Sequence, residues 1–266
     1  MSPRVSGKQV SGNQIQRITK KYMPKFYTFG LDPEKEMDPF YPEYSILLKT
    51  EEAVNSFYDL YKKGRSGVKA GPATHEQQDL YRAMLVFSCA GLDVFVKKLV
   101  KDKLPQLIPV DREVERKFME NIQKGLRSEN LINTVALALV HHTPRDIFLS
   151  EYIKNMTGDS LQSVDALFIV SNASGLDTNS ILNKTKQESI REAFKVRNQI
   201  IHEMDINVED GAARTTGYRT RRQRVAGDME NHTRNILDLS KAIFTAYKEK
   251  FAKYKIGVKK ADPITK

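Results

Sequence analysis

The feature that most constrains the fold is a long apolar segment with almost no charge. Residues 83–96 contain one charged side chain, Asp93. Upstream of them, Thr74 and Gln77 have the spacing of a capping box, which marks the start of a helix. The pattern predicts a helix from residue 75 to about residue 103 that stops before Pro105. A helix that is apolar on nearly every side lies at the centre of its fold or at an interface.

Helical patterns continue along the rest of the chain. We expect helices near 50–63, 111–124, 129–141, 185–205 and 228–254, with a mixed helix and loop insertion at 143–184. Thr185 and Glu188 form a second capping-box pattern. There are no convincing alternating strands and no internal repeat. The sequence therefore predicts an all-α helical bundle that spans residues 46–255.

Residues 1–45 predict an irregular basic arm, and residues 256–266 predict a basic tail. Four prolines interrupt any continuous helix in the arm: Pro24, Pro33, Pro39 and Pro42. Aromatic residues are interleaved with them: Tyr22, Phe26, Tyr27, Phe29, Phe40, Tyr41 and Tyr44. Because so many rings are costly to leave in water, we expect part of the arm to dock on the body or on a partner. Core packing is the favoured fate over stacking on bases.

The formal net charge of +10 is concentrated in three segments. Residues 1–31 carry +6, residues 211–227 carry +5 and residues 241–266 carry +6, so the remaining residues are mildly acidic. The middle segment is an arginine loop without acids, formed by Arg214, Arg219, Arg221, Arg222 and Arg224. Arginine binds phosphate in a bidentate manner, so we expect this loop to contact a phosphate-bearing polyanion such as RNA. A solvated surface loop is the alternative, and the basic ends serve either solubility or polyanion binding.

Several classes of protein are excluded. A single cysteine, Cys89, rules out an internal disulfide framework and cysteine-based zinc fingers. No uncharged apolar run reaches the roughly 18 residues of a membrane-spanning helix, and no apolar core follows Arg4 and Lys8 as in a secretory signal. His141 and His142 would point about 100° apart on a helix and so do not chelate one metal. We expect a soluble, cytoplasmic protein with no membrane partner, metal or cofactor.

The most informative helix is the one that follows Thr185. Its apolar stripe is formed by Ile190, Phe194, Ile201 and Met204. Arg197 falls within that stripe, where a guanidinium needs a carboxylate, a carbonyl or a phosphate. Asp93, on the other apolar helix, is a candidate partner that would support the site.

Asn198 and His202 lie on another face of this helix, as neighbours four residues apart. Arg197 and His202 are five residues apart, which is about 140° around an ideal helix. One straight helix therefore does not point both side chains at one small ligand. A bend near His202, or a cleft between two copies of the helix, would bring them together.

The run Arg197-Asn198-Gln199-Ile200-Ile201-His202 resembles the R-N-x-x-x-H signature of HEPN domains, which are helical bundles common in prokaryotic toxins and antiviral systems. Members carry this motif in a late helix, after an apolar helix such as residues 75–103. The resemblance covers residues 46–255 and has two departures. Glu203 stands where many relatives have glycine, and residues 104–184 are longer than a minimal core needs.

The resemblance implies a metal-independent endoribonuclease whose site forms between two protomers. In that role His202 is the general base or acid, Arg197 stabilises the phosphate, and Asn198 orients His202 or binds phosphate. The products are a 2′,3′-cyclic phosphate and a 5′-hydroxyl. The resemblance also implies a toxin or antiviral effector that an antitoxin or a sensor restrains. Two alternatives stay open: a non-catalytic HEPN-like module that binds RNA or nucleotides, and a helical adaptor in a larger assembly.

Overall fold

The computed structural model describes residues 25–31, 38–67, 71–126, 132–207 and 220–256. These residues form nine helices: α2 (Tyr41–Arg65), α3 (His75–Leu107), α4 (Arg112–Leu126), α5 (Ile132–Val140), α6 (Pro144–Thr157), α7 (Val164–Ala173), α8 (Thr178–Ile181), α9 (Lys184–His202) and α11 (Ala226–Lys253). Within the same ranges, β-type pairing is limited to an isolated bridge between Ile206 and Arg221. The predicted all-α class is confirmed. No helix in these described ranges is both long enough and apolar enough to cross a membrane.

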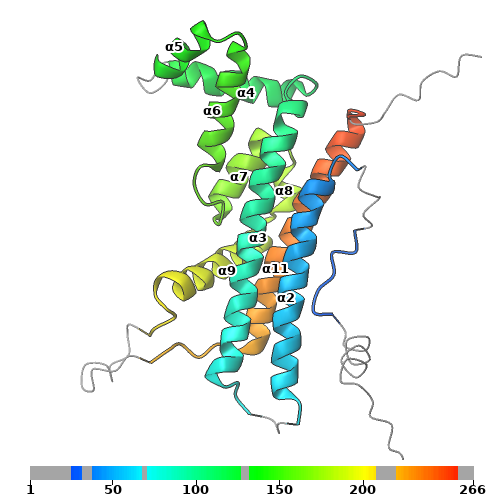
Figure 1. Cartoon of the computed structure of the whole chain (residues 1–266), viewed down its shortest axis with the longest axis vertical. Helices are drawn as coiled ribbons and strands as arrows, with labels where there is room; N and C mark the ends of the chain where they lie inside the picture. Colours follow the sequence, from blue (N-terminus) through cyan, green and yellow to red (C-terminus); the bar gives the residue numbers. More distant parts are fainter. Residues whose placement is uncertain (1–24, 32–37, 68–70, 127–131, 208–219, 257–266) are drawn as a thin grey trace, which may run out of the picture.

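Helix α3 is central, as its apolar sequence predicts. The Thr74 side chain accepts a hydrogen bond from the backbone N–H of Gln77, and the Gln77 side chain accepts one from the backbone N–H of Thr74. Helices α2 and α11 run beside α3 (Figure 1), and buried side chains from all three form the core. The prediction that α3 stops before Pro105 is wrong. Burial of Leu104 and Leu107 stabilises one further turn despite the missing proline N–H.

Helices α2 and α3 approach each other closely at Gly91. A Cβ atom built at this glycine would collide with the side chain of Thr50 on α2. Thr50 is itself buried and donates its hydroxyl to the carbonyl of Ile46. Glycine at this position therefore allows the close approach of α2 and α3.

The aromatic arm packs on the body, as expected. Phe26, Tyr27 and Phe29 are buried. Asn55 of α2 accepts a hydrogen bond from the backbone N–H of Tyr27 and donates one to its carbonyl, while the Tyr27 hydroxyl donates to Asp238 of α11. These bonds hold residues 25–31 along the surface between α2 and α11.

The start of α2 differs from the prediction. Helix α2 begins at Tyr41 rather than near residue 50, so the last residues of the expected arm are helical. Pro42 is tolerated because it occupies the first turn, where its missing N–H would have no partner within the helix. Phe40 and Tyr44 are buried, which explains why the helix extends back to them.

Helices α4, α5 and α6 lie at one end of the bundle, where α6 runs beside the C-terminal part of α3 (Figure 1). Helix α5 carries no charge, yet Leu137, Leu139 and Val140 are exposed on it. The segment at 143–184, which the sequence marks as mixed, contains α6, α7 and the short α8. Val114 and Phe118 of α4 and Tyr152 of α6 are buried and join the hydrophobic core.

Candidate functional site

Helix α9 positions the motif residues, and its first turn differs from the predicted one. Asn183 is the N-cap, because its side-chain oxygen accepts a hydrogen bond from the backbone N–H of Lys186 over 3.0 Å. The helix therefore begins at Lys184, and the expected capping box of Thr185 and Glu188 is wrong. The exposed Asn183 caps the helix two positions before Thr185 could.

The buried face of α9 agrees with the expected stripe only in its first half. Ile190 and Phe194 are buried, but Ile201 is 38% exposed and Met204 is 68% exposed. The helix ends at His202, and Met204 has a positive φ of 53°, so helical spacing no longer applies there. The C-terminal end of α9 therefore presents apolar side chains to solvent beside the motif.

Arg197 is half-buried on the inner edge of α9. Its Nη1 donates a hydrogen bond to Oδ1 of Asn198 over 2.9 Å. Its Nε is buried and has no hydrogen-bond partner among the described residues. An orphan donor of this kind is unfavourable unless a ligand or a movement of the side chain satisfies it.

The expected pairing of Arg197 with Asp93 is wrong. Asp93 accepts a hydrogen bond from the backbone N–H of Leu161 over 2.6 Å and pairs with Lys97 over 3.0 Å. It thus ties α3 to the segment before α7. The neighbour of Arg197 on α3 is Cys89. Burial raises the pKa of this thiol to about 12, although the nearby positive charge of Arg197 partly opposes the increase.

His202 is the last residue of α9 and is exposed, as is Asn198 one turn earlier. Because the helix is continuous between them, Arg197 and His202 keep the separation of about 140° that five helical residues impose. The hydrogen bond to Asn198 holds one guanidinium nitrogen at the exposed edge of the helix. Asn198 and His202 are therefore exposed at the C-terminal end of α9, and the hydrogen bond brings the end of the half-buried Arg197 side chain to Asn198.

Directly after His202 the chain enters a buried ionic cluster that the sequence analysis missed. Asp205 is fully buried and accepts hydrogen bonds from Nε of Arg82 on α3, over 2.7 Å, and from Arg224. Burial alone would raise the pKa of Asp205, but hydrogen bonds from Arg224 and Arg82 outweigh it and lower the pKa below its ordinary value.

The C-terminal part of the arginine loop, from residue 220 onward, contacts this cluster. Arg221 pairs with Asp79, Arg222 with Glu203 over 2.8 Å, and Arg224 with Asp205. Arg214 and Arg219 lie outside the described residues. An RNA-binding role for the loop stays a prediction. At Arg221, Arg222 and Arg224, RNA phosphates would have to compete with the carboxylates that these side chains already bind.

A signal for the cluster was present in the sequence. Arg82 lies three residues before Leu85 and seven before Cys89, which places it on the buried side of α3. The rule that an arginine within an apolar face needs a carboxylate applies to Arg82 as well as to Arg197. The sequence alone could not identify the partner, since Asp205 is 123 residues away.

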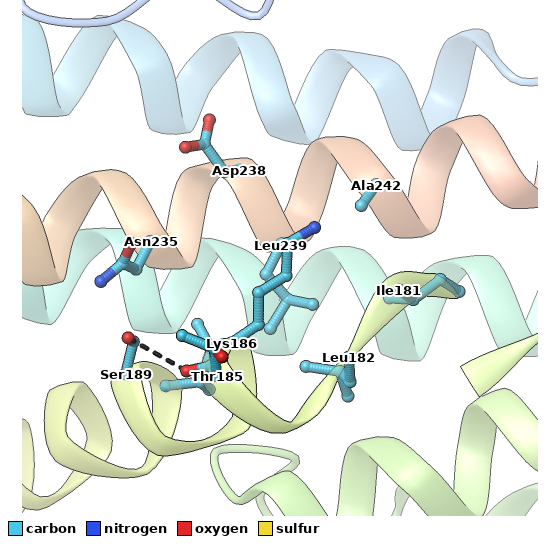
Figure 2. Close-up of a pocket in the computed structure, with 10 residues that line it drawn as sticks. Ile181, Leu182, Thr185, Lys186, Ser189, Asn235, Asp238, Leu239 and Ala242 are labelled. Atoms are coloured by element: carbon cyan, nitrogen blue, oxygen red, sulfur yellow. Dashed lines mark hydrogen bonds between the residues drawn. The ribbon is translucent and has the colours of Figure 1, made fainter. Parts of the chain in front are cut away.

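A small pocket between α9 and α11 is separate from this site. It has a volume of about 130 Å³ and is lined by residues that include Leu182, Lys186 and Leu239 (Figure 2). Its lining residues on α9 lie between Thr185 and Ile190, one turn or more before Arg197. The volume is below the several hundred Å³ of typical ligand sites. Among the described residues, no three metal-binding side chains group together.

Comparison with known families agrees with this geometry. A family model described as RiboL-PSP-HEPN matches residues 45–220, more than half of the chain, including the whole of α9. The chain therefore belongs to the RiboL-PSP-HEPN family, and its fold is a HEPN-type helical bundle. Neither curated proteins nor solved structures gave a match. Membership of a HEPN family points to an RNA-related, nuclease-type function in general.

Proposed function

We propose that this protein is a metal-independent endoribonuclease whose site is formed by Arg197, Asn198 and His202. The observation that carries the proposal is the Arg197–Asn198 hydrogen bond of 2.9 Å, which holds a guanidinium at the exposed edge of α9, one turn before the exposed His202. A cation that binds phosphate and an imidazole that can transfer protons are thereby placed on one accessible end of a helix.

In the proposed reaction the phosphorus is transferred from the 5′-oxygen to the neighbouring 2′-oxygen. A base removes the proton from a 2′-hydroxyl, and the 2′-oxygen attacks the adjacent phosphorus to form a phosphorane. An acid protonates the departing 5′-oxygen as the P–O5′ bond breaks, which leaves a 2′,3′-cyclic phosphate and a 5′-hydroxyl. His202 serves as base or acid, and Arg197 stabilises the negative charge on the phosphorane.

A homodimer supplies the second imidazole in this proposal. Phe87 and Val94, two turns apart on α3, form an apolar strip: they are 48% and 53% exposed, and Phe87 also contacts Phe57 of α2. Helix α9, which packs on α3, exposes a further apolar side chain, Ile201, near its C-terminal end. A strip of this kind is well suited to a second copy of the same chain, because an isologous contact buries the same patch twice. Two such copies would bring two His202 side chains to one cleft.

The biological role in this proposal is that of a toxin or antiviral effector acting in the cytoplasm. A ribonuclease without restraint harms its host, so the effector requires an antitoxin, a sensor or an inactive assembly. This role derives from the HEPN resemblance and not from the geometry of the site.

The test is RNA cleavage in EDTA by wild type, Arg197→Ala and His202→Ala. Two matched controls are Arg191→Ala on the exposed side of α9 and His142→Ala in the turn after α5. We expect cleavage by the wild type and both controls, and none by the two motif variants. Equal cleavage by all five proteins would reject the site, and cleavage that needs added metal would reject the mechanism.

One observation favours a second function. Helix α5 exposes Leu137, Leu139 and Val140, and such a patch is typical of a docking surface. An adaptor or RNA-binding module in a larger assembly would use this surface without catalysis. RNA binding that falls with salt, in a protein that never cleaves, would favour that function.

A further inference from the structure

The segment that follows His202 is fixed at more points than a helix end requires. The backbone N–H groups of Glu203 and Asp205 both donate to the carbonyl of Gln199, over 3.1 and 2.9 Å. The Asp205 carbonyl in turn accepts a hydrogen bond from the backbone N–H of Arg222 over 2.7 Å. Asp205 is therefore bonded through its N–H, its carbonyl and both side-chain oxygens.

The backbone conformation at this point is one that needs support. Met204 and Asp205 have φ angles of 53° and 54°, in the left-handed region. Aspartate tolerates this region, but methionine rarely adopts it. Two successive residues of this kind persist only when the surrounding contacts hold them there.

The support comes from α3. The Arg82 guanidinium donates through Nε to Asp205 and through Nη2 to the carbonyl of Arg222 over 2.8 Å. One arginine thus binds the chain leaving α9 and the chain entering α11. Gln78, one turn earlier on α3, donates to Gln223 and accepts from the backbone N–H of Arg224.

His202 itself has no such contact: no hydrogen bond joins its ring to another described residue. Its position therefore depends on its backbone. The residues directly after it are held in place, because Glu203 pairs with Arg222 and Asp205 pairs with Arg82.

We propose that Asp205, held by Arg82 and Arg224, is a positioning residue that fixes His202 and the base of the arginine loop in the geometry needed for cleavage. The inference rests on the proposed ribonuclease function and deepens it. Asp205 does not touch RNA in this role. It joins three elements, α3, the end of α9 and the returning residues 220–224, into one rigid support.

The first test measures kcat and KM for RNA cleavage by Asp205→Asn. We expect kcat to fall at least about tenfold, since a small displacement of a catalytic group has effects of this size or larger. We expect KM to change much less. Asp165→Asn is the matched control, because it removes an exposed ion pair between Asp165 of α7 and Arg191 of α9. Wild-type kcat in Asp205→Asn, with His202→Ala inactive, would overturn the proposal.

A second variant guards against loss of folding. Arg82→Lys keeps the buried charge but removes the planar guanidinium, in which two separate nitrogens bind Asp205 and the Arg222 carbonyl. We expect a folded protein by circular dichroism with a similar fall in kcat. A folded Arg82→Lys protein with wild-type kcat and KM would also overturn the proposal.

Amide hydrogen exchange separates this proposal from the proposed function. In Asp205→Asn, the amides of residues 203–207 and 222–224 should exchange at least about tenfold faster, while α2 stays protected. If wild type cleaves no RNA, the ribonuclease function fails, and the anchoring role is then decided by exchange alone. Unchanged exchange in Asp205→Asn would reject the anchor whatever the activity.

Discussion

Arg197 and Asn198, adjacent residues on α9, are joined by a hydrogen bond between Nη1 and Oδ1 over 2.9 Å. Adjacent residues on a helix normally point about 100° apart. This bond therefore turns the end of a half-buried side chain toward the exposed face that carries His202. Asn198 links the phosphate-binding and proton-transfer parts of the motif.

This link predicts the effect of changing the acceptor. In Asn198→Asp a carboxylate would pair with Arg197 and offset its charge, so kcat/KM for RNA cleavage should fall about tenfold or more. Asn198→Ala should cost less, because it frees the guanidinium without neutralising it. Steady-state kinetics on one RNA substrate measure both effects.

Thr185→Asp is the matched control, because it adds the same charge at an exposed position in the first turn of α9. We expect its kcat/KM to stay within about twofold of wild type. An equal loss in Thr185→Asp and Asn198→Asp would mean that general repulsion of RNA, and not the contact with Arg197, explains the result.

The contact between α2 and α3 predicts a change in stability. Gly91→Ala places a methyl group against the side chain of Thr50, so the free energy of unfolding should fall by about 1–3 kcal/mol. Gly227→Ala in the first turn of α11 meets no atom within 4 Å and should be neutral or slightly stabilising. Urea denaturation followed by circular dichroism compares the two. Equal midpoints for both variants would contradict the packing described at Gly91.

Sequence patterns predicted those parts of the fold that local chemistry decides. The capping box at Thr74 and the central position of α3 follow from a few neighbouring residues. Likewise, the aromatic residues of the arm predict that it docks, although not where. Asn183, and not Thr185, is the N-cap, because two residues only two positions apart could cap the same helix and propensity alone does not separate them.

The environment of the motif could not be predicted in this way. Arg197 was expected to pair with Asp93, and the actual partner of Asp93 is a backbone N–H 68 residues away. Which carboxylate meets which arginine depends on how the helices cross, and that is set by packing of the whole bundle. The family resemblance identified the residues, and the structure supplied their neighbours.

The buried Asp205 predicts a pH dependence of stability. Its pKa is lowered in the folded state, so its contribution is present above the unfolded value of about 4 and is lost as the pH falls through the folded value. Asp205→Asn should therefore cost about 3 kcal/mol at neutral pH. The difference from wild type should shrink at a pH of about 3. Urea denaturation at both pH values measures it.

Asp165→Asn is again the appropriate control, because the Asp165 side chain is 76% exposed. We expect its stability to match wild type at both pH values, since exposed ion pairs contribute little. A penalty for Asp205→Asn that is the same at neutral and acidic pH would show that the carboxylate is not stabilised by its arginines.

The apolar strip on α3 makes a prediction about assembly. Phe87→Glu places a charge at the centre of the proposed contact between two copies, where Phe87 is 48% exposed and already packs against Phe57. We expect the dimer dissociation constant to rise at least about a hundredfold, because the variant loses apolar burial and buries an unpaired charge. Light scattering after gel filtration measures the mass, and RNA cleavage should be lost together with the dimer.

Ile169→Glu is the control: it makes the same kind of change at a 60% exposed position on α7 and should leave both the dimer and RNA cleavage intact. A monomeric wild type that cleaves RNA would refute the two-copy site while leaving the roles of Arg197 and His202 to be tested by their own variants.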